Sequence, residues 1–142
     1  MHRLLVAVDN SDNAARALDY AVRLAKESGQ VELHIVYAHA PPVVYGEIAI
    51  YMPEERVREL QERHSKDILE PAIAKATAAG VPFRSSILVG DVSHVLVKCA
   101  EDNDCDGIVM GTRGMGAIGN LLMGSVATKV VHLSKLPVTL VK

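Results

Sequence analysis

The sequence predicts an α/β fold, in which an open sheet of parallel strands carries helices on both faces. Five short apolar runs alternate along the chain with four stretches of helical periodicity. The first run, Leu4–Val8, is aliphatic at every position, which is typical of a strand buried on both faces. This alternation requires parallel pairing through helical crossovers. Because 142 residues is the size of one domain, we expect a single domain over residues 1–142.

The first half of the chain is expected to hold two strands and two helices. After the first strand, the polar run Asp9–Asp12 offers N-cap side chains, and Gly29 offers a left-handed residue at the end of the helix. A second strand follows over Val31–Ala38, and residues 39–53 should be a long loop. The next helix should end near Gly80. The apolar stripes that predict these helices are Ala15, Leu18, Val22 and Ala25 in the first, and Val57, Leu60, His64, Ile68, Ala72 and Ala76 in the second.

The second half continues the same alternation. Phe83–Val89 is expected to be the third strand, and Gly90–Asp91 to open a third helix. Residues 108–110 form a short fourth strand, and a helix is expected over about 125–134. Residues 138–141 then close the chain as a fifth strand.

Composition and charge exclude several classes of partner. There is no Trp, one Phe and four Tyr, so aromatic stacking on nucleic-acid bases is not expected. The formal net charge of −2 provides no basic field for a polyanion. No stretch approaches the roughly 20 apolar residues of a membrane span, and the N-terminus does not read as a signal peptide. We therefore expect a cytoplasmic protein without nucleic-acid binding or membrane insertion.

The two cysteines and six histidines indicate neither a disulfide scaffold nor a metal site. Cys99 and Cys105 are separated by five residues, a spacing that matches no common zinc knuckle. The histidines show no ligand spacing either. We expect both cysteines to be buried or half-buried thiols.

A cluster of glycines is the first feature that average composition does not explain. It begins where the fourth predicted strand ends, which is where ligands bind in open α/β sheets. Glycines let backbone N–H groups approach an anion closely, and the helix opened by Gly124-Ser125 presents free amides to phosphate. Arg113 can add positive charge. Five of the ten glycines belong to the cluster: Gly111, Gly114, Gly116, Gly119 and Gly124.

The cluster can be compared with three simpler patterns. Residues 114–119 spell G-x-G-x-x-G, but this dinucleotide fingerprint should follow the first strand and be followed by a ribose-binding acid. A Walker P-loop needs a lysine before Ser125, and none is present. The remaining alternative is a glycine-rich turn that serves close packing only.

The spacing of Gly111-x2-Gly114-x9-Gly124-Ser125 resembles the G-2x-G-9x-G-(S/T) signature of ATP-binding members of the universal stress protein family. The resemblance extends along the whole chain. Val6–Ser11 is similar to the family's first strand and its V-D-x-S turn, and residues 136–141 resemble its closing strand. Two positions depart: Asn10 stands where the family usually has glycine, and Ala127 where some members carry a hydroxyl residue.

The resemblance implies a Rossmann-like sheet of strand order 3-2-1-4-5, with ATP held at the carboxyl ends of the first and fourth strands. Asp9 would follow the first strand and could meet Mg²⁺ carried by the nucleotide. The second strand would present an apolar residue and backbone groups to adenine. The positions that match the family's nucleotide site are Asp9, Ile35, Val36, Met110, Gly111, Arg113, Gly114, Gly124, Ser125, Val126 and Ala127.

Each of these residues also has an alternative role. Asp9 could be only the cap of the first helix, and Arg113 could be a solvated surface charge. Ile35 and Val36 belong to the sheet core in either case. These alternatives stay open on the sequence alone.

Three functions follow from these features. The leading hypothesis is a nucleotide-binding regulatory protein that is at most a slow ATPase, since Asp9 is the one carboxylate expected at the site. The second is a stress-related interaction protein with a vestigial site, which would form a homodimer through the uncharged strand 138–141 and could meet a protein partner through the apolar loop 41–52. The third, a phosphate-transferring or adenylating enzyme, needs a lysine or cysteine near the glycines. Cys105 is expected at the wrong end of the fourth strand.

Overall fold

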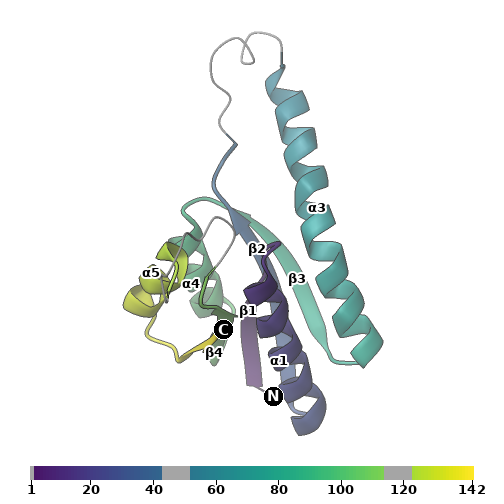
Figure 1. Ribbon diagram of the computed structural model, residues 1–142, viewed down its shortest axis with the longest axis vertical. Helices are drawn as coiled ribbons and strands as arrows, with labels where there is room; N and C mark the ends of the chain where they lie inside the picture. Colours follow the sequence, from purple (N-terminus) through teal and green to yellow (C-terminus); the bar gives the residue numbers. More distant parts are fainter. Residues whose placement is uncertain (1, 43–51, 114–122) are drawn as a thin grey trace.

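A computed structural model describes residues 2–42, 52–113 and 123–142. The strands form one five-stranded parallel sheet in the order β3-β2-β1-β4-β5, which confirms the predicted fold class and strand order (Figure 1). The elements are β1 (His2–Ala7), α1 (Asp12–Ser28), β2 (Val31–His39), α3 (Glu54–Ala79), β3 (Phe83–Val89), α4 (Val92–Asp102), β4 (Gly107–Gly111), α5 (Ser125–Leu133) and β5 (Val138–Val141).

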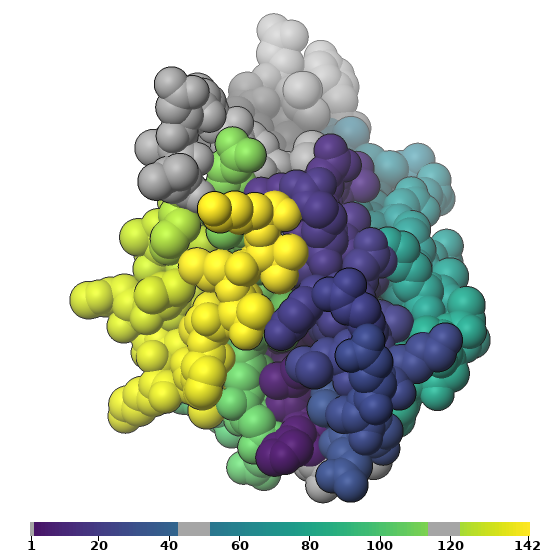
Figure 2. Space-filling model, turned by 60° about the horizontal axis from the view of Figure 1, so that its bottom comes forward, coloured from purple at the N-terminus to yellow at the C-terminus, as the bar shows by residue number. Residues whose placement is uncertain are grey.

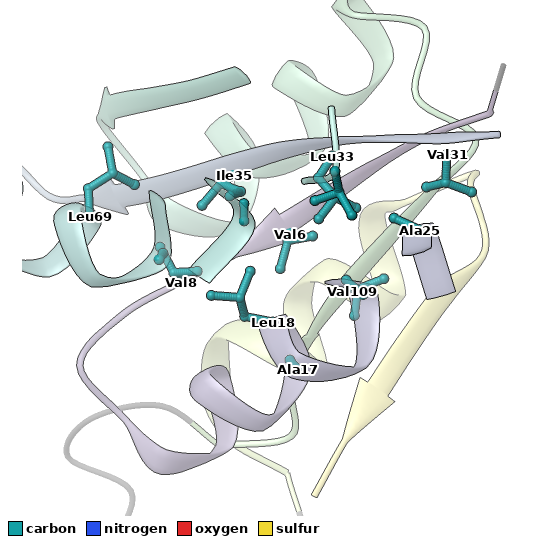
Figure 3. Close-up of a cluster of buried hydrophobic side chains, with 14 of the residues drawn as sticks. Val6, Val8, Ala17, Leu18, Ala25, Val31, Leu33, Ile35, Leu69 and Val109 are labelled. Carbon is teal, nitrogen blue, oxygen red and sulfur yellow. The ribbon is translucent and has the colours of Figure 1, made fainter. Parts of the chain in front are cut away.

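The helices cover the sheet in two layers with a separate core under each. On one face α1 and α3 pack over side chains such as Val6, Leu33 and Val109 (Figure 3). On the other face α4 and α5 pack over Leu5 and Ile108. Neighbouring residues of the central strands therefore point to opposite cores, which explains why these strands are apolar throughout.

The helix ends follow the predicted chemistry. The side chain of Ser11 accepts a hydrogen bond from the Ala14 N–H (3.2 Å) and so caps α1. Gly29 and Gly80 end α1 and α3 with φ values of 66° and 69°, the left-handed conformation that favours glycine.

The predicted apolar stripes of two helices are partly wrong. Ala15 is exposed, and the buried face of α1 contains its neighbour Ala14 instead, because the start of α1 packs with Asn13 and Ala14 against Gly111. In α3, Leu60 and His64 are exposed. The N-terminal half of this helix runs past the end of the sheet (Figure 1), so only its later turns bury a stripe. The buried residues of α3 are Ser65, Leu69, Ala72 and Ala76.

The amino edge of the sheet, where the strands begin, is closed by charge pairs. The Glu32 carboxylate accepts hydrogen bonds from Arg3 Nε (3.0 Å) and Arg84 Nε (3.1 Å), which joins three neighbouring strands. Asp106 accepts the backbone N–H of Arg3 (2.7 Å). These contacts hold the beginnings of β1, β2, β3 and β4 together.

Cys99 and Cys105 are buried and not bonded to each other, as predicted. Burial raises the pKa of both thiols, that of Cys105 to about 11. Both therefore stay protonated at neutral pH and pack as small apolar groups.

No helix in the described part of the chain is both long and apolar enough to cross a membrane.

Candidate functional site

The candidate site lies at the carboxyl edge of the sheet, where β1 and β4 end side by side. Val6 of β1 lies opposite Val109 of β4, so the residues that follow each strand emerge together. Asp9 follows β1, and Thr112 and Arg113 follow β4. The helices α1 and α5 begin at the same edge, and each directs its N-terminal amides and the positive end of its dipole there.

Asp9 is half-buried and shapes the turn into α1. Its Oδ1 accepts a hydrogen bond from the Ser11 N–H (2.8 Å). The helix cap itself is Ser11, so the alternative that Asp9 is merely the N-cap does not hold. The Asp9 charge is also felt by Tyr37, a buried residue of β2 whose phenol pKa is raised by burial and by this carboxylate.

Ile35 and Val36 lie in the middle of β2, and their side chains are fully buried, one in each core. The Val36 carbonyl accepts the Val8 N–H (2.9 Å) and is therefore part of the ladder with β1. On the other side of β2, the His39 carbonyl accepts the Gly90 N–H next to β3 (2.9 Å). Because backbone groups alternate in direction along a strand, the N–H and C=O of Ala38 point past the end of β1, toward the candidate site.

The end of β4 packs tightly against the start of α1. Met110 is buried in the core below α5. At Gly111, a Cβ atom would lie 2.8 Å from the Asn13 Cβ, 2.9 Å from its carbonyl carbon and 3.0 Å from the Ala14 nitrogen. Close packing against α1 therefore requires glycine at position 111, so the packing interpretation of the cluster holds at this position.

Thr112 joins four elements through three hydrogen bonds. Its N–H donates to the Val141 carbonyl of β5 (2.9 Å), and its carbonyl accepts the Gly124 N–H at the start of α5 (2.7 Å). Its Oγ1 accepts from Nδ2 of Asn13 in α1 (3.2 Å). Thr112 is only 7% exposed, so the position of the chain leaving β4 is strongly constrained.

Within the described residues, the first turn of α5 has backbone amides without acceptors. Gly124 is the N-cap, with no side-chain cap hydrogen bond. The first amide inside the helix that finds a partner is Thr128 N–H, which donates to the Gly124 carbonyl (3.0 Å). The amides of Ser125, Val126 and Ala127 meet no backbone acceptor within residues 2–42, 52–113 and 123–142. Such a first turn is suited to an anion.

The hydroxyl groups at the start of α5 differ in their freedom. Ser125 is exposed, so its Oγ is available to a ligand at the helix start. The Thr128 hydroxyl instead donates to the Gly124 carbonyl (2.9 Å). Thr128 therefore does not replace the hydroxyl that position 127 lacks.

Arg113 is exposed, and no carboxylate within the described ranges forms an ion pair with it. Within these ranges, its guanidinium is therefore available to an anion. Gly114, the second glycine of the spaced motif, lies outside the described residues, as do Gly116 and Gly119.

The described residues offer little to a metal ion on their own. No group of three or more His, Cys, Asp or Glu side chains in this part of the chain could hold one. Asp9 is a single carboxylate, and an oxygen-coordinated Mg²⁺ needs further ligands. The residues thus fit Mg²⁺ only if the nucleotide phosphates and water supply the rest of its coordination shell.

Three residues at this edge were not found from the sequence: Ala38, Asn13 and Thr112. Ala38 offers no chemical signal, since only its backbone matters. Asn13 looks like one more polar residue of a capping segment, and Thr112 like a spacer between Gly111 and Arg113. The hydrogen bond between Asn13 and Thr112 joins residues 99 positions apart, which no local pattern reveals.

Comparisons with known proteins agree with the fold and identify the family. Universal stress protein YxiE of Bacillus subtilis is 36% identical over 147 residues and covers 99% of both chains. A universal stress protein solved in complex with cAMP is 30% identical, covers 99% of this chain and 95% of its own, and superposes with a TM-score of 0.69. The Archaeoglobus fulgidus universal stress protein in complex with dAMP is 26% identical, covers 100% and 98%, and has the same TM-score of 0.69. The model of the universal stress protein family matches residues 1–142, and this chain therefore belongs to that family.

Proposed function

We propose that this protein binds an adenine nucleotide, with ATP as the expected ligand, and acts as a stress-response regulator that is at most a slow ATPase. The observation that carries the proposal is the first turn of α5, where three consecutive amides lack acceptors within the described residues. Arg113 leaves the neighbouring strand at the same edge, and no carboxylate within the described ranges pairs with its charge. Relatives solved with dAMP and cAMP, nucleotides of the same chemical class, support this assignment.

The proposed arrangement follows the chain from β4 to α5. The phosphates lie against the amides of Ser125, Val126 and Ala127, with the Ser125 hydroxyl and Arg113 as further donors. The base lies above the end of β1, where Ala38 presents both an N–H and a C=O. A donor and an acceptor in that order can pair with N1 and the exocyclic amine of adenine. Asp9 stands between these two parts of the site, where it can contact ribose or a phosphate-bound Mg²⁺.

This site is better suited to binding than to rapid hydrolysis. Phosphoryl transfer needs a residue that positions water and acids that hold Mg²⁺ near the transferred group. Asp9 is the one carboxylate that we place at the site. The buried thiols of Cys99 and Cys105 cannot serve as nucleophiles there, because both are packed under the sheet and remain protonated.

Calorimetric titration tests the proposal. ATP and AMP are titrated into the unmodified protein, Gly124→Val and His132→Val. Val at position 124 fits the extended backbone (φ −75°) but crowds the phosphate position, so affinity should fall at least tenfold. His132 is exposed near the far end of the same helix, so its variant should bind normally. If the unmodified protein binds neither nucleotide at millimolar concentration, the proposal is wrong.

A second candidate function, favoured by β5, is that of a homodimeric interaction protein. β5 is an outer strand without charged residues, and its odd-numbered carbonyls are used by β4, as Pro137 and Val141 show. The backbone groups of Val138 and Leu140 therefore point outward, which favours pairing with a second copy. Figure 2 shows this C-terminal segment, in yellow, lying on the surface beside α1.

Light scattering at micromolar concentration tests the dimer. The unmodified protein should have the mass of a dimer. Leu140→Pro removes an outward N–H while sparing the bonds to β4, so it should favour the monomer. A monomeric unmodified protein would contradict the dimer. The partner-binding role of loop 41–52 remains a prediction, since residues 43–51 lie outside the described ranges. The cytoplasmic location also remains a prediction.

A further inference from the structure

Asn13 occupies an unusual place for its residue type. Asn is favoured at the N-cap, but the cap of α1 is Ser11, and Asn13 lies inside the helix, where its intrinsic helix propensity is poor. It is also only 7% exposed. A buried amide inside a helix is unfavourable unless its polar atoms are bonded. The contacts of this side chain should therefore explain why it is there.

Both ends of the Asn13 side-chain amide are hydrogen-bonded, and neither hydrogen bond caps the N-terminus of α1. Nδ2 donates to Thr112 Oγ1 (3.2 Å) at the end of β4. Oδ1 accepts from Nη2 of Arg16, whose Nε donates in turn to the backbone oxygen of Lys142 (2.6 Å). Asn13 thus ties the start of α1 to the chain segment that leaves β4, while Arg16 ties it to the residue after β5.

Thr112 transmits this restraint to the proposed phosphate site. Its carbonyl holds the Gly124 N–H (2.7 Å), which fixes where α5 begins and where the free amides of its first turn point. Arg113 is the next residue, so the backbone direction at Thr112 also sets the origin of its side chain. A rotation of Thr112 would displace both groups that are expected to contact phosphate.

We propose that Asn13 and Thr112 are positioning residues for the nucleotide phosphates, acting through the start of α5 and through Arg113. The inference rests on the proposed function and deepens it. Neither side chain needs to touch the ligand. Their contribution is to hold the phosphate donors in place before the ligand arrives, which lowers the ordering cost of binding.

The test compares ligands with and without a phosphate. Adenosine and AMP are titrated into each variant. The dissociation constant of adenosine divided by that of AMP measures how much the phosphate adds to affinity. Thr112→Val keeps the shape of the side chain but removes Oγ1. It should reduce this ratio about tenfold while the affinity for adenosine stays within twofold of the unmodified protein. Thr112→Ser keeps the hydroxyl and should retain the ratio.

Arg16→Met provides a second measurement on an exposed side chain, in case Thr112→Val does not fold. It removes the partner of Asn13 Oδ1 without opening the core, so the ratio should fall in the same direction by about threefold. A purely structural role would weaken adenosine and AMP equally. An unchanged ratio in the folded variants would overturn the inference. If the unmodified protein bound neither ATP nor AMP, the proposed function would be overturned instead.

Discussion

At the amino edge of the sheet, the Glu32 carboxylate accepts hydrogen bonds from the side chains of Arg3 and Arg84, and the Asp106 carboxylate accepts the backbone N–H of Arg3. At the carboxyl edge, by contrast, Arg113 meets no carboxylate within the described residues. The same contrast holds for backbone groups. The His2 N–H donates to the Gln30 carbonyl (2.8 Å), while the first amides of α5 find no such partner within residues 2–42, 52–113 and 123–142. Charged groups at the amino edge are thus used to hold strands together. At the carboxyl edge, the Arg113 side chain and the first amides of α5 have no such partner within the described residues and are available to a ligand.

The difference teaches where to look for stability and where to look for function in this fold. A change at the amino edge should alter the free energy of unfolding and leave nucleotide affinity unchanged. A change in an exposed group at the carboxyl edge should do the reverse. Residues that both pack and shape the site, such as Gly111, should affect both quantities.

Gly111→Ala should have the largest effect, because the added Cβ would meet backbone atoms of α1 at 2.9 and 3.0 Å, which cannot move aside without shifting the helix. Overpacking of this kind costs about 3 kcal/mol. Equilibrium urea unfolding measures the loss, and AMP titration should show weaker binding as well.

Gly107→Ala, at the other end of the same strand, is the matched control. Its Cβ would lie 3.2 Å from the Pro137 carbonyl oxygen and 3.3 Å from a Leu4 methyl group, contacts that small shifts can relieve. We expect a loss of about 1 kcal/mol and normal AMP affinity. Equal losses from the two substitutions would break the proposed difference between the edges.

Glu32→Gln should be the next largest change, and it acts at the amino edge alone. The variant keeps the side-chain shape but leaves Arg3 and Arg84 without their shared carboxylate. Charge-assisted hydrogen bonds of a partly buried group contribute about 2 kcal/mol together, so the urea midpoint should fall accordingly. AMP affinity should remain within twofold, and a larger loss of affinity would show that the two edges are coupled.

Arg113→Gln is the converse experiment at the carboxyl edge. Because the side chain is exposed, the free energy of unfolding should not change measurably. An exposed charge–phosphate contact accounts for about a fivefold change in AMP affinity, and adenosine affinity should be unaffected. The prediction fails if the variant binds AMP as tightly as the unmodified protein does.

The sequence predicts the strands well because each is a short aliphatic run and the parallel order follows from the alternation with helices. Helix faces are predicted less well. Ala14 and Ala15 are chemically identical, and only the approach of Gly111 decides which of them is buried. The same tertiary contact explains why Gly111, which belongs to the spaced glycine motif, is also required for packing against α1. The free amides of α5 were predictable from Gly124-Ser125, but the Asn13–Thr112 contact was not.

The last prediction concerns pH and the buried histidine behind the amino edge. His34 is 2% exposed and contacts Ser86 Oγ through Nε2 (2.8 Å). Its pKa is lowered from 6.5, first by burial and then by the charges of Arg84 and Arg3, while Glu32 opposes them. His34 therefore binds a proton near pH 6.5 in the unfolded chain, but only at a lower pH in the folded chain. Stability is retained above that pH and is lost as the pH falls from about 6.5 toward the lowered pKa.

Urea midpoints at about pH 7.5 and pH 5 check this prediction. His34→Gln can keep the hydrogen bond to Ser86 but cannot bind a proton, so its midpoint should fall less on acidification than that of the unmodified protein. The exposed His132→Gln serves as a control and should follow the unmodified protein. Glu32→Gln sharpens the test, because it removes the one neighbouring charge that raises the pKa of His34 while both arginines remain. The urea midpoint of Glu32→Gln should therefore fall more on acidification than that of the unmodified protein. An unchanged pH dependence would show that the charges of the amino edge do not affect the protonation of His34.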